Sequence, residues 1–345
     1  MQIDRYHITS SNVPFIIAEI ALGHEGSLGM AMAYIDLAKS CGASAVKFQM
    51  HLAHEESTPW EPWRVPFSHQ DKTRFDYWQR TAFLFDEWQK LKHHAEHLGL
   101  VFLCSPFSLK ACDWLEEMNI SAWKVASGEI HNQQLMQRLA QSNKPIILSS
   151  GLSRTHEVIG LVKGLQVQKR SVALLHCTTR YPTQAEEVGL NVMEEMHALL
   201  PTLPLGLSDH SGEVYPAVLA TYLGACIIEV HLTFHHSMFG PDVKSSLTPD
   251  QFKEMVRAVN FAHIMRNNPV NKDTQIDQLS CTRIIFSRSL YTQTSLRIGE
   301  ILTEKHIGYK KPGGGLTYEQ KNLILGRKAK KDLPENHCLR VEDFE

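Results

Sequence analysis

Short apolar runs alternate along the chain with longer segments whose apolar residues recur with the period of a helix, up to about residue 265. The longer segments predict helices, among them Leu28–Ser40, Phe85–Leu98, Leu109–Met118, Gln134–Ser142 and Tyr215–Leu223. The short runs predict eight strands: Phe15–Ile20, Ala45–Gln49, Leu100–Cys104, Ala122–Ala126, Pro145–Ser149, Val172–His176, Pro204–Ser208 and Cys226–His231. Eightfold alternation favours an α/β fold of the closed (β/α)8 TIM-barrel type over an open doubly wound sheet.

One long connection interrupts this regularity between His51 and about Ala82, and it is rich in tryptophan and charge. Connections of that length are uncommon unless they are functional or disordered, and the aromatic residues argue against disorder. Two interpretations remain open. The segment is either a lid or substrate loop at the active rim of the barrel, or a dimer contact.

The pattern changes after Ile264, where a polar stretch is followed by short apolar runs and Gly-rich turns. We therefore expect a barrel domain over 1–265, a linker over 266–281 and a small, mostly β domain over 282–345. The runs Phe286–Tyr291, Arg297–Thr303 and Lys310–Leu316 are its candidate short strands and Gly-rich turns. A unit of about sixty residues is near the lower limit of independent stability, so it is expected to dock on something.

Composition and charge narrow the function further. A formal net charge of -2 offers no broad basic surface, so neither a nucleic acid nor a membrane is an expected partner. The seven cysteines are scattered and form no Cys-x-x-Cys pair, which argues against a disulfide framework or structural zinc and favours the cytoplasm. The polar stretch Met1–Ser11 is not typical of a signal peptide. Ala217–Phe234, although apolar, is interrupted by charge and predicts a helix followed by a strand.

Polar side chains collect where the predicted strands end. In a TIM barrel these ends form one rim, and that rim carries the active site. The residues at or just after strand ends are Glu19, Lys47, Gln49, Ser105, Lys124, Ser127, Glu129, Ser149, Thr178, Tyr181, Ser208, His210, Glu229 and His231.

Two of these residues are lysines inside apolar strands. Burying Lys47 and Lys124 is costly without an anionic partner, so the pair suggests a bound dianion such as a phosphate. The simpler interpretation is that they pair with Glu19 and Glu129, and both interpretations can hold together.

Two histidines, His210 and His231, follow apolar runs that would hold them rigidly. Neutral imidazoles are good ligands for a divalent metal, although their spacing fits no local metal motif and a pair of ordinary core histidines would look the same. The polar rim around them favours the metal site.

With these residues in view, the chain resembles the sialic acid synthase (N-acetylneuraminate synthase) family over nearly its whole length, and the C-terminal unit resembles that family's antifreeze-like (SAF, β-clip) domain. The motifs that carry the resemblance occur in order along the chain: Ile17-Ala18-Glu19-Ile20, Gly42–Gln49, Lys124–Ile130, Lys144–Gly151, Leu174–Thr178, Tyr181-Pro182-Thr183, Ser208-Asp209-His210, and Gly240-Pro241-Asp242 with Ser246-Leu247.

The resemblance implies a reaction in which phosphoenolpyruvate condenses with the open-chain aldehyde of an N-acylated hexosamine, giving a nine-carbon keto acid sugar and phosphate. A divalent metal, Mn²⁺ with Mg²⁺ or Co²⁺ as alternatives, would be held by His210 and His231. Glu19 and Glu129 would stabilise charge, direct water and move protons, and the sequence does not say which of them activates the water. The remaining matches divide into phosphoenolpyruvate contacts (Lys47, Lys124, Ser105, Ser127, Ser149 and Ser208) and acceptor contacts (Gln49, Tyr181 and Asp242).

Three positions depart from the family pattern and bear on the acceptor. Thr179 stands where relatives often have Asn or Ser, and the cationic Arg180 is unusual beside it. The family's small domain sends an arginine into the partner's active site in a domain-swapped homodimer, and Lys311 replaces it here. Lysine keeps the charge but loses the bidentate fork, so we expect different recognition of the N-acyl sugar.

Two other functions remain open at this stage. A retro-aldol or lyase barrel would use a Schiff-base lysine or a different metal set, whereas this chain has two lysines suited to phosphate. A non-catalytic sugar-binding relative would be expected to have lost catalytic groups, and those named above are all present.

Overall fold

The computed structural model describes all 345 residues and divides them into two compact units, Met1–Asn268 and Pro269–Glu345. In the first unit, eight parallel strands form a nearly closed barrel in the order β5-β4-β3-β10-β9-β8-β7-β6, with β6 beside β5. The strands are β3 (Phe15–Ala21), β4 (Ala45–Met50), β5 (Val101–Pro106), β6 (Trp123–Val125), β7 (Ile146–Ser149), β8 (Val172–Cys177), β9 (Leu205–Asp209) and β10 (Ile227–Leu232). All eight predicted strands are confirmed within two residues at each end.

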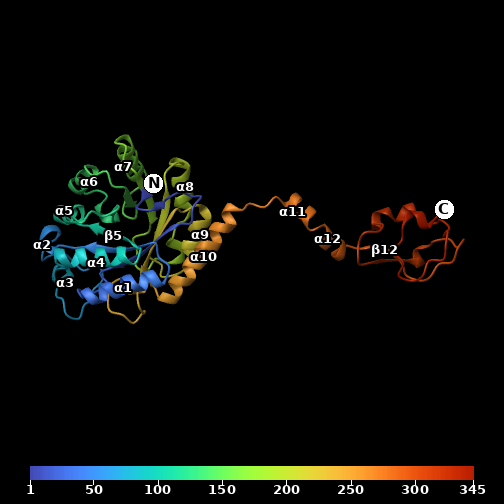
Figure 1. Ribbon diagram of the computed structural model, residues 1–345, viewed down its shortest axis with the longest axis horizontal. Helices are drawn as coiled ribbons and strands as arrows, with labels where there is room; N and C mark the ends of the chain where they lie inside the picture. Colours follow the sequence, from blue (N-terminus) through green and yellow to red (C-terminus); the bar gives the residue numbers. More distant parts are fainter. The chain divides into compact units, whose positions relative to one another are not determined.

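At least one helix follows each strand, and Figure 1 shows the main helices around the strands. They are α1 (Leu28–Ser40), α4 (Phe85–His97), α5 (Leu109–Glu117), α6 (Gln133–Ala140), α7 (Thr155–Val167), α8 (Asn191–Leu199), α9 (Tyr215–Leu223) and α10 (Pro249–Asn267). Local chemistry sets several ends: Ser27 and Ser108 cap α1 and α5 by accepting a backbone N–H, and Gly224 ends α9 with a φ of 104°. None of the helices combines the length and apolar character needed to span a bilayer.

Two apolar cores hold the barrel together. The larger lies between strands and helices, and the smaller fills the inside of the barrel with residues such as Phe15, Ile147 and Leu175. Ile3 and Ile8 belong to the inner core. Ile3 lies in a short antiparallel pair of β1 (Gln2–Ile3) and β2 (Tyr6–His7), and Ile8 directly follows this pair. The packed interior leaves space for a site only beyond the C-terminal ends of the strands.

The long connection over 51–82 is ordered and has its own small core, in which Phe75, Tyr77 and Trp78 are buried. It contains two helices, α2 (Ala53–Glu56) and α3 (Arg74–Thr81), and Thr73 and Asp76 form a capping box at the start of α3. The substrate-loop interpretation gains support because several of its side chains line the cavity described below.

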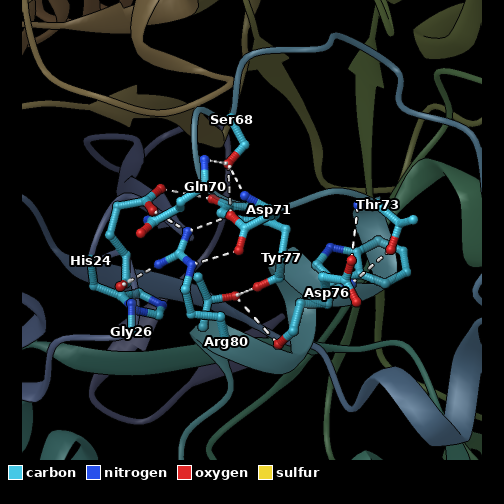
Figure 2. A network of polar contacts seen from close by, with 12 residues as sticks. His24, Gly26, Ser68, Gln70, Asp71, Thr73, Asp76, Tyr77 and Arg80 are labelled. Carbon is cyan, nitrogen blue, oxygen red and sulfur yellow. Dashed lines mark hydrogen bonds and ion pairs between the residues drawn. The ribbon is translucent and has the colours of Figure 1, made fainter.

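Arg80 ties this connection to the β3–α1 loop (Figure 2). Its guanidinium donates to both carboxylate oxygens of Asp71 at 2.9 Å and to Glu25 Oε2 at 2.8 Å, and Tyr77 donates to the other oxygen of Glu25 at 2.9 Å. Gly26 permits this approach, because its φ is +79° and a Cβ there would lie 2.7 Å from the Arg80 carbonyl oxygen.

We expect Arg80→Met to loosen the connection, because Asp71 and Glu25 would lose their shared charged donor. Limited proteolysis should cleave the 51–82 segment about tenfold faster than in the parent protein. Arg257→Met is the matched control, since it removes an arginine from an exposed pair with Glu254. Equal cleavage rates in the Arg80 variant and the parent would show that Arg80 does not hold the 51–82 connection in place.

The second unit contains two helices, α11 (Lys272–Gln278) and α12 (Ser280–Phe286), and a small antiparallel sheet of β12 (Ser289–Thr292) and β13 (Ile307–Lys310). The predicted boundaries placed a linker at 266–281, and most of that segment is helical. Two of the predicted strands are wrong in extent. Phe286 ends α12. The Arg297–Thr303 run makes a single isolated bridge, Ile301 with Lys328, beside a core that includes Leu290 and Leu302.

Candidate active site

The inward-facing positions of the strands change from apolar to polar toward one end of the barrel. Successive inward residues are two apart, so β3 presents Ile17 and then Glu19, and β10 presents Ile227 and then Glu229. The same change occurs on the other strands. The register between strands places these polar residues side by side, so that Glu19 lies beside Lys47 on β4 and beside His231 on β10.

A cavity of about 770 Å³ opens at this polar end. Of the sixteen residues given a role from the sequence, thirteen line it, namely Glu19, Lys47, Gln49, Lys124, Ser127, Glu129, Ser149, Thr179, Tyr181, Ser208, His210, His231 and Asp242. The roles assigned to them remain predictions.

Two buried lysines share one carboxylate at the floor of the cavity. Glu229 Oε1 lies 3.6 Å from Lys47 Nζ and 3.4 Å from Lys124 Nζ. Lys47 also pairs with Glu19 at 2.8 Å and donates to Ser105 at 3.4 Å, whereas Lys124 donates to Ser149 at 2.7 Å. The predicted partner of Lys47 is confirmed, but Lys124 pairs with Glu229 and not with Glu129.

The two lysines differ electrostatically because Lys47 has two carboxylate partners and Lys124 has one. Burial works against the charge of Lys47, but Glu19 and Glu229 outweigh it and raise its pKa. Burial lowers the pKa of Lys124, and Glu229 offsets this only in part. Burial would raise the pKa of Glu229, yet Lys124 and Lys47 hold it at about 2. The site is therefore short of negative charge beside Lys124.

The two predicted metal-binding histidines face each other across part of the cavity, with ring centres 5.4 Å apart. His210 Nδ1 lies 3.0 Å from the Thr178 carbonyl oxygen, so Nδ1 carries the hydrogen and the lone pair of Nε2 is available. Burial lowers the pKa of His231 to about 3, which keeps its imidazole neutral. No group of three or more His, Cys, Asp or Glu is arranged to hold an ion. The chemistry of two imidazole donors suits a divalent metal, which would take its other ligands from water or substrate.

Aromatic and charged groups from three loops form the wall beside these histidines. The Tyr181 ring packs against His210 with centroids 4.2 Å apart. Arg64, from the 51–82 connection, lies over Tyr181 at 4.0 Å and pairs with Asp242 at 2.6 Å. Tyr181 and Asp242 follow β8 and β10, so the connection contributes to the same wall as the barrel loops.

Ser127 lies at a crowded point where the loops after β6, β7 and β8 meet. Its hydroxyl accepts the Gly151 N–H at 3.0 Å. A Cβ at Gly151 would lie 2.1 Å from Thr179 Oγ1, so only glycine lets the three loops approach this closely.

Three predicted residues do not line the cavity. Ser105 lies behind Lys47 and reaches the site through that lysine. Arg180 is exposed and pairs with Glu187, which holds its guanidinium outside the cavity. Lys311 belongs to the second unit, where it lies over the Phe286 ring at 5.2 Å, and its predicted reach into a partner's site stays a prediction.

A model described as the NeuB family matches residues 34–270. The chain belongs to the NeuB family. The family predicted from the sequence is thereby confirmed, since its relatives are named as synthases of sialic and related acids.

Relatives of this NeuB-family chain span almost its whole length. The N,N'-diacetyllegionaminic acid synthase of Campylobacter jejuni is 30% identical and covers 94% of the chain and 98% of the relative. The human N-acetylneuraminate-9-phosphate synthase is 29% identical, covering 95% and 92%. The crystal structure of N-acetylneuraminic acid synthetase from Leptospira borgpetersenii, in complex with citrate, matches with a TM-score of 0.71 and 25% identity over 81% of this chain and 95% of that one.

Some residues of the NeuB-family site were missed or given no role in the sequence analysis. Glu229 was recognised only as a rim residue, although its place inside an apolar strand beside two buried lysines could have identified it. His51, Glu56 and Arg64 also line the cavity. They lie on the long connection, where no strand periodicity fixes the direction of a side chain.

Proposed function

We propose that the chain condenses phosphoenolpyruvate with the open-chain aldehyde of an N-acylated hexosamine, giving a nonulosonic acid and phosphate with the help of a divalent metal. The observation that carries the proposal is the pair of buried lysines that share Glu229 at one end of the cavity. Because the two lysines share one carboxylate, their ammonium groups can bind a small substrate that carries both a carboxylate and a phosphate.

The lysine end of the cavity would bind phosphoenolpyruvate. Lys124 lacks a carboxylate of its own, so an anionic group near Lys124 and Ser149 would complete its surroundings. Ser127, Ser149 and Ser208 add hydroxyl donors around the same floor, and they line the cavity. Binding would also fix the enol carbon of the substrate relative to the histidine pair.

His210 and His231 would hold the metal through neutral ring nitrogens. When bound there, the metal supplies Lewis acidity toward the aldehyde oxygen and orients the two substrates. Tyr181, packed on His210, would keep that ring in place and line the sugar pocket.

The carboxylates would manage charge and protons. As C3 of phosphoenolpyruvate bonds to the aldehyde carbon, positive charge develops at C2, water adds there, and phosphate leaves by C–O cleavage. Glu19 is held by Lys47 and by Gln49, which donates to it at 2.8 Å, so it is fixed to stabilise that charge or direct the water. Burial raises the pKa of Glu129, as suits a group that gives and takes a proton at the sugar.

The outer part of the cavity has more acidic than basic side chains. Glu55, Glu56, Glu61, Glu129 and Asp242 line it, against Arg64 and Arg74, and each arginine already pairs with one of these acids. This balance favours an uncharged acceptor, such as N-acetylmannosamine or a 2,4-diacetamido-2,4,6-trideoxy hexose, over a hexosamine 6-phosphate.

Phosphate release from phosphoenolpyruvate tests the function. The assay contains Mn²⁺ and, in turn, N-acetylmannosamine, its 6-phosphate and 2,4-diacetamido-2,4,6-trideoxy hexoses. We expect release with one uncharged sugar, none without a sugar, and a nonulosonic acid in equal amount. If no sugar of the panel supports release, the proposed condensation is wrong for this acceptor class.

Arg64→Ala should weaken acceptor binding, because it removes the group that joins Tyr181 to Asp242. We expect the acceptor KM to rise about tenfold while the KM for phosphoenolpyruvate changes less than twofold. Arg64→Lys, which keeps the charge but not the planar stack, should give an intermediate value. An equal rise in both KM values would show that Arg64 does not act specifically on acceptor binding.

The second unit would serve as an antifreeze-like domain that brings Lys311 to the acceptor in a domain-swapped homodimer. Lys311 is exposed within its own unit, as such a role requires. Lys311→Ala should raise the acceptor KM several-fold, and sedimentation should show a dimer. An unchanged acceptor KM would remove Lys311 from the site.

A further inference from the structure

A histidine and a glutamate form a buried pair in the cavity that the condensation does not use. His51 Nδ1 lies 2.7 Å from Glu56 Oε1, and each side chain is only 5% exposed. The His51 ring is held between the rings of Trp78 and Phe107, with centroids 4.5 and 4.1 Å away. The His51 ring therefore cannot rotate or move away from Glu56 without disturbing this aromatic stack.

Neighbouring hydrogen bonds place one proton between the two residues. Gln49 donates its amide N–H to Glu19, so its amide oxygen faces His51 Nε2 at 3.1 Å. Nε2 must therefore carry a hydrogen and donate it to Gln49. The contact between Nδ1 and Glu56 Oε1 needs a second hydrogen, which the imidazole and the carboxyl group share.

Glu56 has a second oxygen that is not engaged in this contact. Glu56 Oε2 is buried and has no hydrogen-bond partner in the protein, and Glu56 lines the cavity. Unpaired buried carboxylate oxygens are costly, so a bound hydroxyl group would be a favourable partner. Glu129 lines the same cavity, and one of its oxygens accepts from Asn132 at 2.8 Å.

The acceptor needs such a pair of groups. Amino sugars in water exist almost entirely as closed rings, whereas the condensation requires the aldehyde. Ring opening moves one proton off the anomeric hydroxyl and one onto the ring oxygen, so it needs a base and an acid on the same sugar.

We propose that the cavity has a second activity, which is to open the acceptor ring, with Glu56 as the base and Glu129 as the acid. Glu56 Oε2 takes the proton of the anomeric hydroxyl, the bond between C1 and the ring oxygen breaks, C1 becomes the aldehyde, and the ring oxygen takes a proton from Glu129. No oxidant or other reactant is needed. His51 is a positioning residue that fixes Glu56 and shares its proton. This inference rests on the proposed function for the choice of sugar.

Anomer exchange tests the activity without phosphoenolpyruvate. The probe is N-acetylmannosamine labelled with ¹³C at C1, or the diacetamido trideoxy sugar if that is the one that supports phosphate release. NMR exchange spectroscopy should show that the parent enzyme speeds interconversion of the two anomers, and that Glu56→Gln and His51→Asn lower this acceleration at least about tenfold. Glu254→Gln is the control, because it makes the same substitution in an exposed pair with Arg257 that does not line the cavity.

A second measurement uses an aldehyde that cannot close a five- or six-membered ring: the 4,5-di-O-methyl derivative of N-acetylmannosamine, or the 5-O-methyl derivative of the diacetamido trideoxy sugar. Glu56→Gln should lower phosphate release with the cyclic sugar at least about tenfold more than with this aldehyde. The ratio should not change in Glu254→Gln. An equal loss with both acceptors, or no anomer exchange by the parent enzyme, would overturn the inference. Absence of any phosphate release by the parent enzyme would instead overturn the proposed condensation.

Discussion

Glu229→Gln is expected to lower the free energy of unfolding by about 3–5 kcal/mol, because it leaves two buried ammonium groups with one carboxylate between them. Glu229 is 5% exposed and lies within 3.6 Å of both Lys47 and Lys124. Glutamine has nearly the same shape, so the change removes charge and leaves packing in place. Lys124 should be affected most, since Glu229 is its one carboxylate partner.

Urea unfolding, followed by circular dichroism, measures this effect. Inorganic phosphate should stabilise the Glu229→Gln variant more than the parent protein, because an anion between the lysines replaces the lost charge. Glu254→Gln is the matched control. It makes the same substitution in a pair with Arg257 that is exposed to solvent, and it should leave the midpoint unchanged. A Glu229 variant as stable as the Glu254 variant would show that the lysines do not depend on Glu229.

The barrel could be predicted from sequence because its signals are local and repeated. A buried parallel strand is an apolar run, and each run is separated from the next by a helical period, so eight repeats specify both the elements and their order. The predicted helices Leu28–Ser40 and Tyr215–Leu223 match the structure residue for residue, since a serine cap begins the first and a glycine ends the second.

The partners within the site could be predicted only in part. Position at a strand end places a residue on the rim, but the register between strands decides which carboxylate meets which lysine. Glu19 and Lys47 are directly opposite in the register of β3 and β4, so that pair is correct. Glu129 lies in a short 3₁₀ turn after β6, and its carboxylate binds Asn132 and leaves Lys124 to Glu229.

The small second unit was harder to predict for a physical reason. Its core is built from single residues in short bridges, such as Leu296 opposite Leu333, so few of its segments are long enough to show a period. Phe286, predicted to begin a strand, is instead the last residue of the seven-residue helix that begins at Ser280.

The site as a whole follows from one change along the strands. Inward positions near the N-terminal ends are apolar and close the barrel, whereas those two residues further on are charged or hydroxylated. Burying so many polar groups costs stability that the apolar core below must offset. Most buried charges are paired, but Lys124 shares its one carboxylate with Lys47. A bound anion would therefore give Lys124 a second partner.

Removal of divalent metal is expected to abolish phosphate release and to do so reversibly. His210 and His231 line the cavity with ring centres 5.4 Å apart, and replacing either one would remove half of the proposed protein ligands. We expect EDTA to lower the rate at least about 1,000-fold, with recovery on adding Mn²⁺, and His231→Asn to weaken Mn²⁺ binding at least about 100-fold.

Electron paramagnetic resonance of free Mn²⁺ measures binding without reference to activity. The matched control is His176→Asn, because His176 is also a buried barrel histidine but donates to the Val188 carbonyl at 2.8 Å and does not line the cavity. It should keep the Mn²⁺ affinity of the parent protein. If His231→Asn and His176→Asn bind Mn²⁺ equally well, the metal lies elsewhere, and the two histidines are core residues that support Tyr181.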